Sequence, residues 1–418
     1  MGRVRLAVTA PDRLDVHTVE IDDPGDLISC LPHPSALAWV RHGEGLVGWG
    51  EAARLTVPAG PGRFTAVQGL LAELFGGARV DDPLGVPGSG PVAFGSFAFD
   101  PASGGSVVIV PRRVLGRRGG RAWLTTIGEA SGPAARPVES ADPLTAPSQL
   151  TWSDGALSAP GWQRAVAAAV QHIRTGRLGK VVLARDLYAQ AAEPIDARVL
   201  LARLAQRFPA CYTFACAGLV GATPELLIRR TGEEVESLVL AGTTARGTDP
   251  ADDTARAARL LASAKDRHEH AYAAQMVREA LAPLCAELSV PDDPQVLTLP
   301  NVMHLASPVR GRLHGERSVL DVVEALHPTP AVCGTPTDRA LELIRHLEAM
   351  DRGRYAGPVG WVDARGDGEW GIALRCAELD GTRARLFAGC GIVADSDPAA
   401  ELAEAHNKFR AMRYALQG

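Results

Sequence analysis

The stretch "GPVGWVDARGDGEWGIALRCAEL", residues 357–379, consists of two apolar runs on either side of a polar turn at 365–368. Short runs rich in valine, tryptophan and isoleucine, joined by glycine and aspartate, predict a β-hairpin. The alternation of side chains along a strand puts Gly371, Ala373 and Arg375 on one face. A charged residue that follows two small ones predicts a pocket wall, where a guanidinium would bind a carboxylate at two points. An arginine in water at the edge of a sheet remains the alternative.

Strand and helix patterns mix along the rest of the chain without a regular βαβ rhythm, which favours an α+β fold. Residues 1–150 are rich in glycine and proline and carry short apolar runs typical of strands, with one helix at 64–75. The stretch 129–150 has the composition of a linker or a long surface loop. Further along, the patterns predict helices at 160–179, 253–288, 336–351 and 398–417, and strands at 180–190, 211–232 (two strands) and 382–393.

Composition excludes several classes of function. The 418 residues include 43 basic and 48 acidic side chains, a net charge of −5, so there is no basic footprint for nucleic acid. Seven scattered cysteines without a CxxC pair argue against a disulfide framework or a zinc cage and fit a reducing cytoplasm. The first residues lack the pattern of a signal peptide. No run approaches the roughly 18 apolar residues of a membrane helix, so we expect a soluble cytoplasmic protein.

The stretch "SAKDRHEHAYAAQMVREAL", residues 263–281, places Glu269 between His268 and His270 at the start of a helical pattern. Residues two apart on a helix point to different sides, and a zinc-binding helix of the zincin type needs histidines four apart. These two histidines therefore cannot bind one zinc ion, and a solvated helix face is the plain interpretation. A role for Glu269 depends on whether other carboxylates can reach it.

The last predicted helix carries such carboxylates. Glu401, Glu404 and Lys408 share one face because their spacings are three and four. An ordinary surface pair between Glu404 and Lys408 is one interpretation. The other is a carboxylate pair that faces the helix of Glu269 and binds Mg²⁺, an ion that prefers oxygen ligands.

Three further features are weak when taken singly. "AGCGIV", residues 388–393, matches the first two glycines of a dinucleotide loop but lacks the third, so a close approach of the backbone to a carboxylate is favoured instead. Lys180 begins the strand "KVVLAR", and Glu225 follows Pro224 in "GATPELLIRR". A lysine at a strand end and a glutamate in a turn are usually solvated.

Taken together and in order, these stretches resemble the chorismate-utilising enzymes, and among them the isochorismate synthase branch. The match is close over about 160–415 and weaker before it. It rests on "GKVVLAR", "GATPELLIRR", "LAGTTARG", "SAKDRHEH", "HPTPAVCGTP", the hairpin stretch and "FAGCGIVADSDPAAELAEAHNK". The resemblance implies one large α+β domain with two layered, twisted antiparallel sheets flanked by helices. Residues 1–150 would be its strand-rich part and residues 151–418 its catalytic part. It also implies chorismate as substrate, Mg²⁺ as the metal, no organic cofactor, and a monomer.

The resemblance also assigns roles to single residues. Glu269 and Glu404 match the family's two Mg²⁺-binding glutamates, and Glu401 would bind a metal-bound water one turn away. Lys180 matches the general base that activates water for attack on C2 of the ring. Glu225 matches the general acid that protonates the departing C4 hydroxyl. Lys180 would have to be neutral and Glu225 protonated, the reverse of their states in free solution.

Substrate-binding positions of the family match a further set. The ring carboxylate and metal side is matched by Gly242, Thr243 and Lys408, and His304 lies at the cleft. Positions at the enolpyruvyl carboxylate are matched by Tyr355, Arg375 and Gly389.

The branch within the family depends on two residues. Lys180 favours water over ammonia as the nucleophile. Ala331 stands where the salicylate synthase branch, which goes on to eliminate pyruvate, usually has threonine, so alanine favours a pure isochorismate synthase. Salicylate synthase and a chorismate-binding homologue without catalytic activity remain the alternatives.

Overall fold

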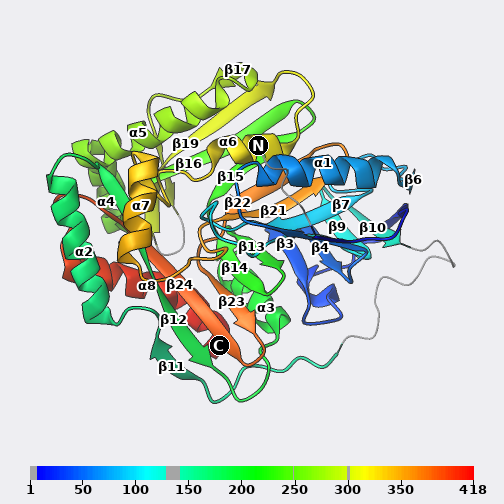
Figure 1. Cartoon of the computed structure of the whole chain (residues 1–418), viewed down its shortest axis with the longest axis horizontal. Helices are drawn as coiled ribbons and strands as arrows, with labels where there is room; N and C mark the ends of the chain where they lie inside the picture. Colours follow the sequence, from blue (N-terminus) through cyan, green and yellow to red (C-terminus); the bar gives the residue numbers. More distant parts are fainter. Residues whose placement is uncertain (1–6, 129–141, 248, 299–301) are drawn as a thin grey trace.

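The computed structural model describes residues 7–128, 142–247, 249–298 and 302–418. Two large twisted sheets form its centre, and helices surround them (Figure 1). Strands from before residue 129 and from after residue 150 contribute to both sheets. The pairs that carry the site residues are antiparallel, whereas β2 and β6 run parallel. The predicted α+β fold with two layered, largely antiparallel sheets is therefore confirmed.

The first sheet has the spatial order β1 (Ala7–Thr9), β5 (Ala53–Val57), β8 (Ser106–Val110), β7 (Val92–Ser96), β21 (Pro358–Asp363), β22 (Gly368–Ile372), β15 (Leu226–Thr231), β16 (Glu234–Ala245), β19 (Val302–Leu313) and β17 (Cys285–Ser289), and β18 (Gln295–Thr298) also pairs with β19. The second sheet has the order β11 (Thr151–Asp154), β12 (Lys180–Gln190), β24 (Arg383–Ile392), β23 (Cys376–Asp380), β14 (Leu219–Thr223), β13 (Tyr212–Cys216), β3 (Leu37–Arg41), β4 (Glu44–Trp49), β9 (Arg113–Arg118), β10 (Arg121–Gly128), β2 (Asp15–Ile21) and β6 (Arg79–Asp81), and β20 (Gly334–Thr335) pairs with β12. The helices are α1 (Arg63–Gly76), α2 (Ala159–Arg174), α3 (Ala197–Arg207), α4 (Pro250–Ala262), α5 (Ala264–Leu281), α6 (Val319–Leu326), α7 (Thr337–Leu347) and α8 (Pro398–Gln417), with a short 3-10 turn at Ile28–Cys30.

Large side chains join the two sheets. Trp39 of β3 stacks on Tyr212 of β13, with ring centroids 4.8 Å apart. The indole N–H of Trp39 donates to Oε2 of Glu369, on β22 of the other sheet, at 2.9 Å. Phe97 and Trp370 lie 5.6 Å apart and are almost fully buried. Burial of each such ring stabilises the fold by roughly 1.5–3 kcal/mol, so the space between the sheets is the core.

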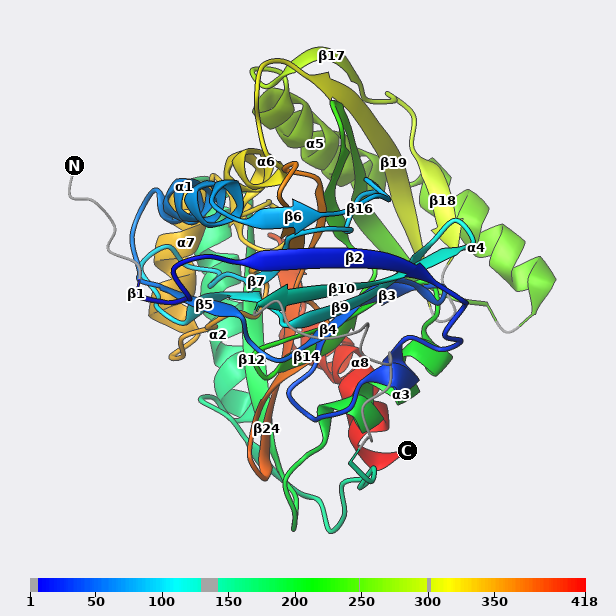
Figure 2. The ribbon, with the colours of Figure 1, turned by 90° about the vertical axis from the view of Figure 1, so that its right-hand side faces the viewer.

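Helices at the two ends of the molecule position the predicted site. Helix α5 lies along β16 and β19 of the first sheet, with α4 beside it, as Figure 2 shows. Helix α8 packs on β24 of the second sheet, with α2 and α3 against it, and α7 packs on β12. The predicted metal-binding helices α5 and α8 thus belong to different sheets.

Two predicted segments differ from the structure. The helix expected at 253–288 is two helices, α4 and α5, followed by strand β17. The break is at Ser263, whose extended backbone begins α5 and whose hydroxyl accepts from the N–H of Asp266. Serine followed three residues later by an acid is a helix-start signal, so the break was present in the sequence. The stretch 211–232 forms three strands rather than two. Strands β13 and β14 form a hairpin in the second sheet, and the chain then passes to β15 of the first sheet.

Other helices end a few residues earlier than predicted. The helix expected at 160–179 ends at Arg174, and the helix expected at 336–351 ends at Leu347. Part of the expected linker at 129–150 lies outside the described residues, and its remainder from 142 precedes β11 without regular structure, apart from bends.

The hairpin at 357–379 forms as predicted from β21 and β22, but it ends sooner. Strand β22 stops at Ile372, and the chain crosses to the second sheet, where β23 begins at Cys376. Arg375 lies in this crossing with φ of 48°, a left-handed conformation that is uncommon for arginine. The prediction that Arg375 continues the alternation of the strand is therefore wrong. Its side chain is placed by the crossing between the sheets.

All seven cysteines lie in the described residues, and each has a free thiol. Within those same residues, no helix has both the length and the apolar character needed to cross a bilayer.

Candidate active site

Lys180 and Glu269 form an ion pair between β12 and α5. The Nζ of Lys180 donates to Oε1 of Glu269, and the side chains are 20% and 31% exposed. Gly391 of β24 lies opposite Val182 in the ladder, and a Cβ at Gly391 would lie 2.7 Å from Cε of Lys180. The glycine therefore leaves room for the lysine side chain, which explains one of the two glycines in "AGCGIV".

Glu225 carries the carboxylate that the sequence singled out for catalysis. It follows Thr223, whose hydroxyl accepts from the N–H of Glu225. Among the described residues, no side chain or N–H makes a hydrogen bond or ion pair with its carboxylate. Burial raises the pKa of Glu225 to about 7, against the opposing positive charges of Lys180 and Lys408. A substantial share of Glu225 is therefore protonated near neutral pH, the state that a general acid needs.

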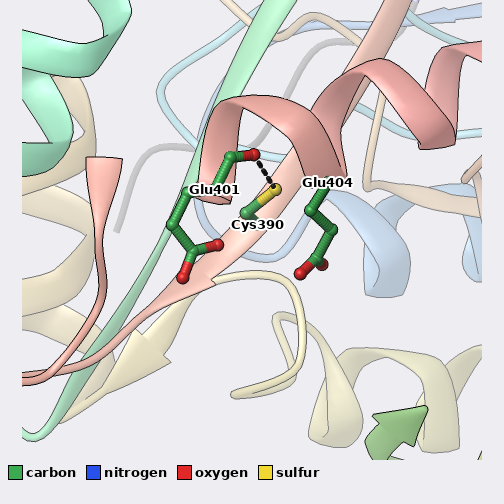
Figure 3. A group of neighbouring side chains, drawn as sticks. All are labelled: Cys390, Glu401 and Glu404. Carbon is green, nitrogen blue, oxygen red and sulfur yellow. Dashed lines mark hydrogen bonds between the residues drawn. The ribbon is translucent and has the colours of Figure 1, made fainter. Parts of the chain in front are cut away.

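Glu401, Glu404 and Cys390 form a cluster of potential metal ligands at the start of α8 (Figure 3). One ligand atom from each lies within 4.8 Å of the others. Ser396 holds the first carboxylate, because its hydroxyl donates to Oε1 of Glu401 at 2.7 Å. The Sγ of Cys390 donates to the main-chain oxygen of Glu401 at 3.4 Å. Burial raises the pKa of this thiol to about 12. The two carboxylates are the ligands of this cluster that suit a hard cation.

Glu269 is not part of that cluster. Its carboxylate forms an ion pair with Lys180, whereas Glu404 forms an ion pair with Lys408 at 2.7 Å. Each predicted metal-binding glutamate thus has an ammonium group against it. The pairing of Glu269 with Glu404 across one ion stays a prediction.

The residues predicted to bind the enolpyruvyl carboxylate are Tyr355, Arg375 and Gly389. Within the described part of the chain, Arg375 makes no side-chain hydrogen bond or ion pair. Burial lowers its pKa, while the neighbouring Tyr355 and Glu404 act in the opposite direction. Arginine remains charged at any physiological pH. A half-buried cation whose donors no described residue uses can therefore bind an anionic ligand.

Tyr355 lies beside it. Its ring stacks on Phe387 with centroids 5.0 Å apart, and burial raises the pKa of its hydroxyl well above the ordinary value, so the phenol stays protonated. A Cβ on Gly389 would lie 2.9 Å from that hydroxyl. The Nζ of Lys408 donates to the main-chain oxygen of Gly389 at 2.7 Å. The first glycine of "AGCGIV", Gly389, thus makes room for the tyrosine.

Gly242, Thr243 and His304 form a third group, at a bulge between β16 and β19. Gly242 has φ of 77°, which glycine adopts without strain. The hydroxyl of Thr243 and Nδ1 of His304 are hydrogen-bonded at 2.8 Å. Burial, with the charges of Arg375 and Lys408, lowers the pKa of His304 to about 4. The imidazole is therefore neutral and serves as a hydrogen-bonding group.

Contacts connect several of these groups: Lys408 binds Glu404 and the main chain of Gly389, and Gly391 on the same strand lies against Lys180. Glu225 responds to Lys180 and Lys408, Arg375 responds to Glu404, and His304 responds to Arg375 and Lys408. The structure therefore brings together residues that lie far apart in the sequence.

His270 has a structural task. Its Nδ1 bonds to the main-chain oxygen of Ala241 at 3.2 Å, and its Nε2 bonds to Ser307 at 2.8 Å. Both ring nitrogens are used, so His270 ties α5 to the bulge instead of binding a metal. Sequence reasoning missed this task, and it also missed Cys390 and Ser396, whose contacts depend on how α8 packs.

Comparison with known proteins places the chain in a family. A family model described as "chorismate binding enzyme" matches residues 37–417. Isochorismate synthase DhbC of Bacillus subtilis is 45% identical over 61% of this chain and 67% of its own length. Isochorismate synthase EntC of Escherichia coli is 36% identical over 86% of this chain and 89% of its own. The structure of MenF, the menaquinone-specific isochorismate synthase of Escherichia coli, superposes with a TM-score of 0.78 at 25% identity, covering 100% of this chain and 96% of that one. The chain therefore belongs to the chorismate binding enzyme family.

Proposed function

We propose that this protein is an isochorismate synthase, which converts chorismate into isochorismate with Mg²⁺. The observation that carries the proposal is the unpartnered carboxyl of Glu225, whose pKa is raised to about 7 by burial. It shares a site with Lys180, the other residue that the reaction needs. The printed names of the similar proteins, all isochorismate synthases, support the same activity.

The reaction exchanges one hydroxyl for another across the ring. Water attacks C2, the ring double bonds shift, and the hydroxyl on C4 leaves. Lys180 accepts a proton from the attacking water, and Glu225 gives its proton to the departing hydroxyl, so water is both consumed and released. Lys180 must first give up its own proton, and in this structure its ammonium is paired with Glu269.

The donor set at the site fits Mg²⁺. Glu269 and Glu404 would hold the ion, with Glu401 beside them, because hard cations prefer carboxylate oxygens. The ammonium groups of Lys180 and Lys408 pair with two of these carboxylates, so each of the two already binds a cation. When bound, the ion would neutralise and hold the ring carboxylate of chorismate.

The other carboxylate of chorismate requires a separate cation. Arg375 supplies one, since its guanidinium has no partner among the described residues. The hydroxyl of Tyr355 and the backbone at Gly389 lie next to each other and would add hydrogen bonds. Lys408, Gly242, Thr243 and His304 would line the side of the ring carboxylate.

The reaction would stop at isochorismate because Ala331 offers no hydroxyl. The alternative is elimination of pyruvate to give salicylate, and the variant Ala331→Thr tests it. We expect this variant to release more pyruvate per isochorismate than the wild type, and chromatography with a coupled lactate dehydrogenase assay measures both. An unchanged ratio would show that position 331 does not control the branch.

The test of the activity itself is incubation of the purified chain with chorismate and Mg²⁺ in ¹⁸O-labelled water. We expect isochorismate with one labelled oxygen at C2 in the first turnovers, and no product when the metal is chelated. Stoichiometric pyruvate and salicylate would show a salicylate synthase. Binding of chorismate without any product would show a non-catalytic homologue.

Three further properties belong to this proposal. We expect a cytoplasmic monomer, as an enzyme of soluble metabolites requires no membrane and the predicted residues all come from one chain. The isochorismate would serve the synthesis of a catecholate siderophore, menaquinone, salicylate or another secondary metabolite.

A further inference from the structure

A buried arginine lies behind three predicted site residues. The guanidinium of Arg352, 3% exposed, donates to the main-chain oxygens of Val332 at 2.8 Å and Val182 at 2.7 Å. Its Nε donates to Oε2 of Glu348 at 2.9 Å. The cation therefore joins three segments that are far apart in sequence: the loop before β20, strand β12 and the end of α7.

Glu348 completes the arrangement from the other side. Its Oε1 accepts from the N–H of Ala184 at 2.7 Å, and the same carboxylate binds Arg352. The side chain of Glu348 is 1% exposed and that of Arg352 is 2% exposed. A buried ion pair of this kind adds little net stability compared with apolar residues of the same size, so stability alone does not account for it.

The segments that the Arg352–Glu348 pair joins contain residues of the proposed active site. Val182 is two residues from Lys180 on β12, and Val332 follows Ala331 directly. The N–H of Tyr355 donates to the main-chain oxygen of Arg352 at 3.1 Å. The guanidinium thus fixes the segments that carry the proposed base and the residue proposed to set the branch. The main chain of the same residue binds the main chain of the substrate-binding tyrosine.

We propose that Arg352 and Glu348 are positioning residues for the reaction. They set the distance between Lys180 and Ala331 by binding the backbone next to each. This inference rests on the proposed function, because it concerns the alignment of the same site. A misplacement of reacting groups by about 1 Å costs on the order of a hundredfold in rate. Small shifts of the segments next to Lys180 and Ala331 would therefore lower the rate measurably.

Arginine is required by the geometry. Its planar fork reaches Val182, Val332 and both oxygens of Glu348 at once. Lysine keeps the positive charge against Glu348 but has one nitrogen and cannot bind all three groups. Arg352→Lys therefore removes the alignment while leaving the charge balance intact.

The chain offers a matched control in Arg198. It is also 3% exposed, forms a buried pair with Asp196, and donates to the main-chain oxygens of Pro32 and Asp142. None of these residues belongs to the proposed site. Arg198→Lys therefore reproduces the loss of a buried guanidinium away from the chemistry.

The experiment compares Arg352→Lys with Arg198→Lys in the full chain with Mg²⁺. We expect Arg352→Lys to lower kcat by roughly tenfold to a hundredfold, with little change in KM for chorismate because Arg375 is untouched. Hydrogen exchange should become at least about tenfold faster in 180–184 and 329–335. Arg198→Lys should lose thermal stability but keep the kcat of the wild type and its exchange in both segments.

The outcomes separate the two proposals. If Arg352→Lys keeps the kcat of the wild type, or if the two variants lose kcat equally, the positioning role is wrong while the activity stands. If the wild type makes no isochorismate, the proposed function fails. If Arg352→Lys also leaves hydrogen exchange at 180–184 and 329–335 unchanged, the positioning role is wrong as well. Should Arg352→Lys fail to fold, Glu348→Asp gives the same test, because a shorter carboxylate withdraws from Ala184.

Discussion

Two glutamates of the interior, Glu369 between the sheets and Glu225 in the candidate active site, behave in opposite ways. Glu369 is 4% exposed and accepts from the indole of Trp39 at 2.9 Å. It pairs with Arg229 at 3.1 Å and with Arg118. Burial alone would raise the pKa of Glu369, but the two arginines outweigh it and hold the value below the ordinary range.

Glu225 has no such partners in the described part of the chain, and burial raises its pKa to about 7. The difference shows how the same residue type serves structure in one place and chemistry in another. A buried carboxylate with its cations in place stays ionised and joins elements. A buried carboxylate whose cations are kept at a distance holds a proton that it can donate.

The carboxylates proposed to bind Mg²⁺ are an intermediate case, since Glu404 pairs with Lys408. They give the largest expected effect. We expect Glu404→Gln or Glu269→Gln to abolish turnover while the fold remains intact, because a neutral amide is a poor ligand for a hard cation. Steady-state rates across a range of Mg²⁺ concentrations, with circular dichroism as the folding control, measure this. Near-normal activity of either variant at low Mg²⁺ would contradict the metal assignment.

Glu225→Gln tests the unpaired carboxyl. An amide of the same size has no proton to transfer, so kcat should fall by about 10²–10⁴-fold, the usual contribution of general acid–base catalysis. Binding of chorismate, measured by calorimetry, should survive because Arg375 remains. Lys180→Ala should behave similarly, and loss of binding in that variant would make Lys180 a substrate anchor instead of a base.

Glu369→Gln tests the paired carboxylate. Its removal takes one counter-charge from Arg118 and leaves Arg229 with the half-exposed Glu236, which should cost about 3 kcal/mol of unfolding free energy. The folded fraction should keep its kcat, since no proposed site residue contacts Glu369. Urea unfolding and active-site titration measure the two quantities. Full stability of this variant would show that the pair adds nothing to the core.

The pH dependence of stability gives the smallest effect. Glu225 titrates near 4.5 when unfolded and near 7 when folded, so the folded state holds more protons between these values and stability falls as pH rises through them. Relative to the wild type, Glu225→Gln should gain about 1–3 kcal/mol between pH 4.5 and 7. Parallel stability curves for the two proteins would contradict a raised pKa.

The sequence predicts the long regular elements well and the junctions poorly. Strand β12 and helix α8 have strong patterns, and the structure has them at or next to the predicted bounds. The break at Ser263 was missed because the helical pattern continues across it. The crossing at Arg375 could not be found, because it depends on where the second sheet lies.

Some residues of the candidate site could be predicted from the sequence, and others could not. Motif resemblance named Lys180, Glu225 and Arg375, which the structure brings into one group of interacting charges. It did not name Arg352 or Glu348, whose partners are largely main-chain atoms of distant segments. Contacts to backbone groups leave no pattern in a single sequence.

The most direct test of the central claim is the protonation state of Glu225 itself. Infrared difference spectra between the wild type and Glu225→Gln, recorded without substrate from pH 5 to 9, isolate the carbonyl stretch of this one carboxylic acid. The account predicts a protonated-acid band that is present at pH 5 and disappears with a midpoint near pH 7, in line with the raised pKa. A band that is absent throughout this range would mean that Glu225 is ionised like any solvated glutamate, and the proposed acid would have to be another residue.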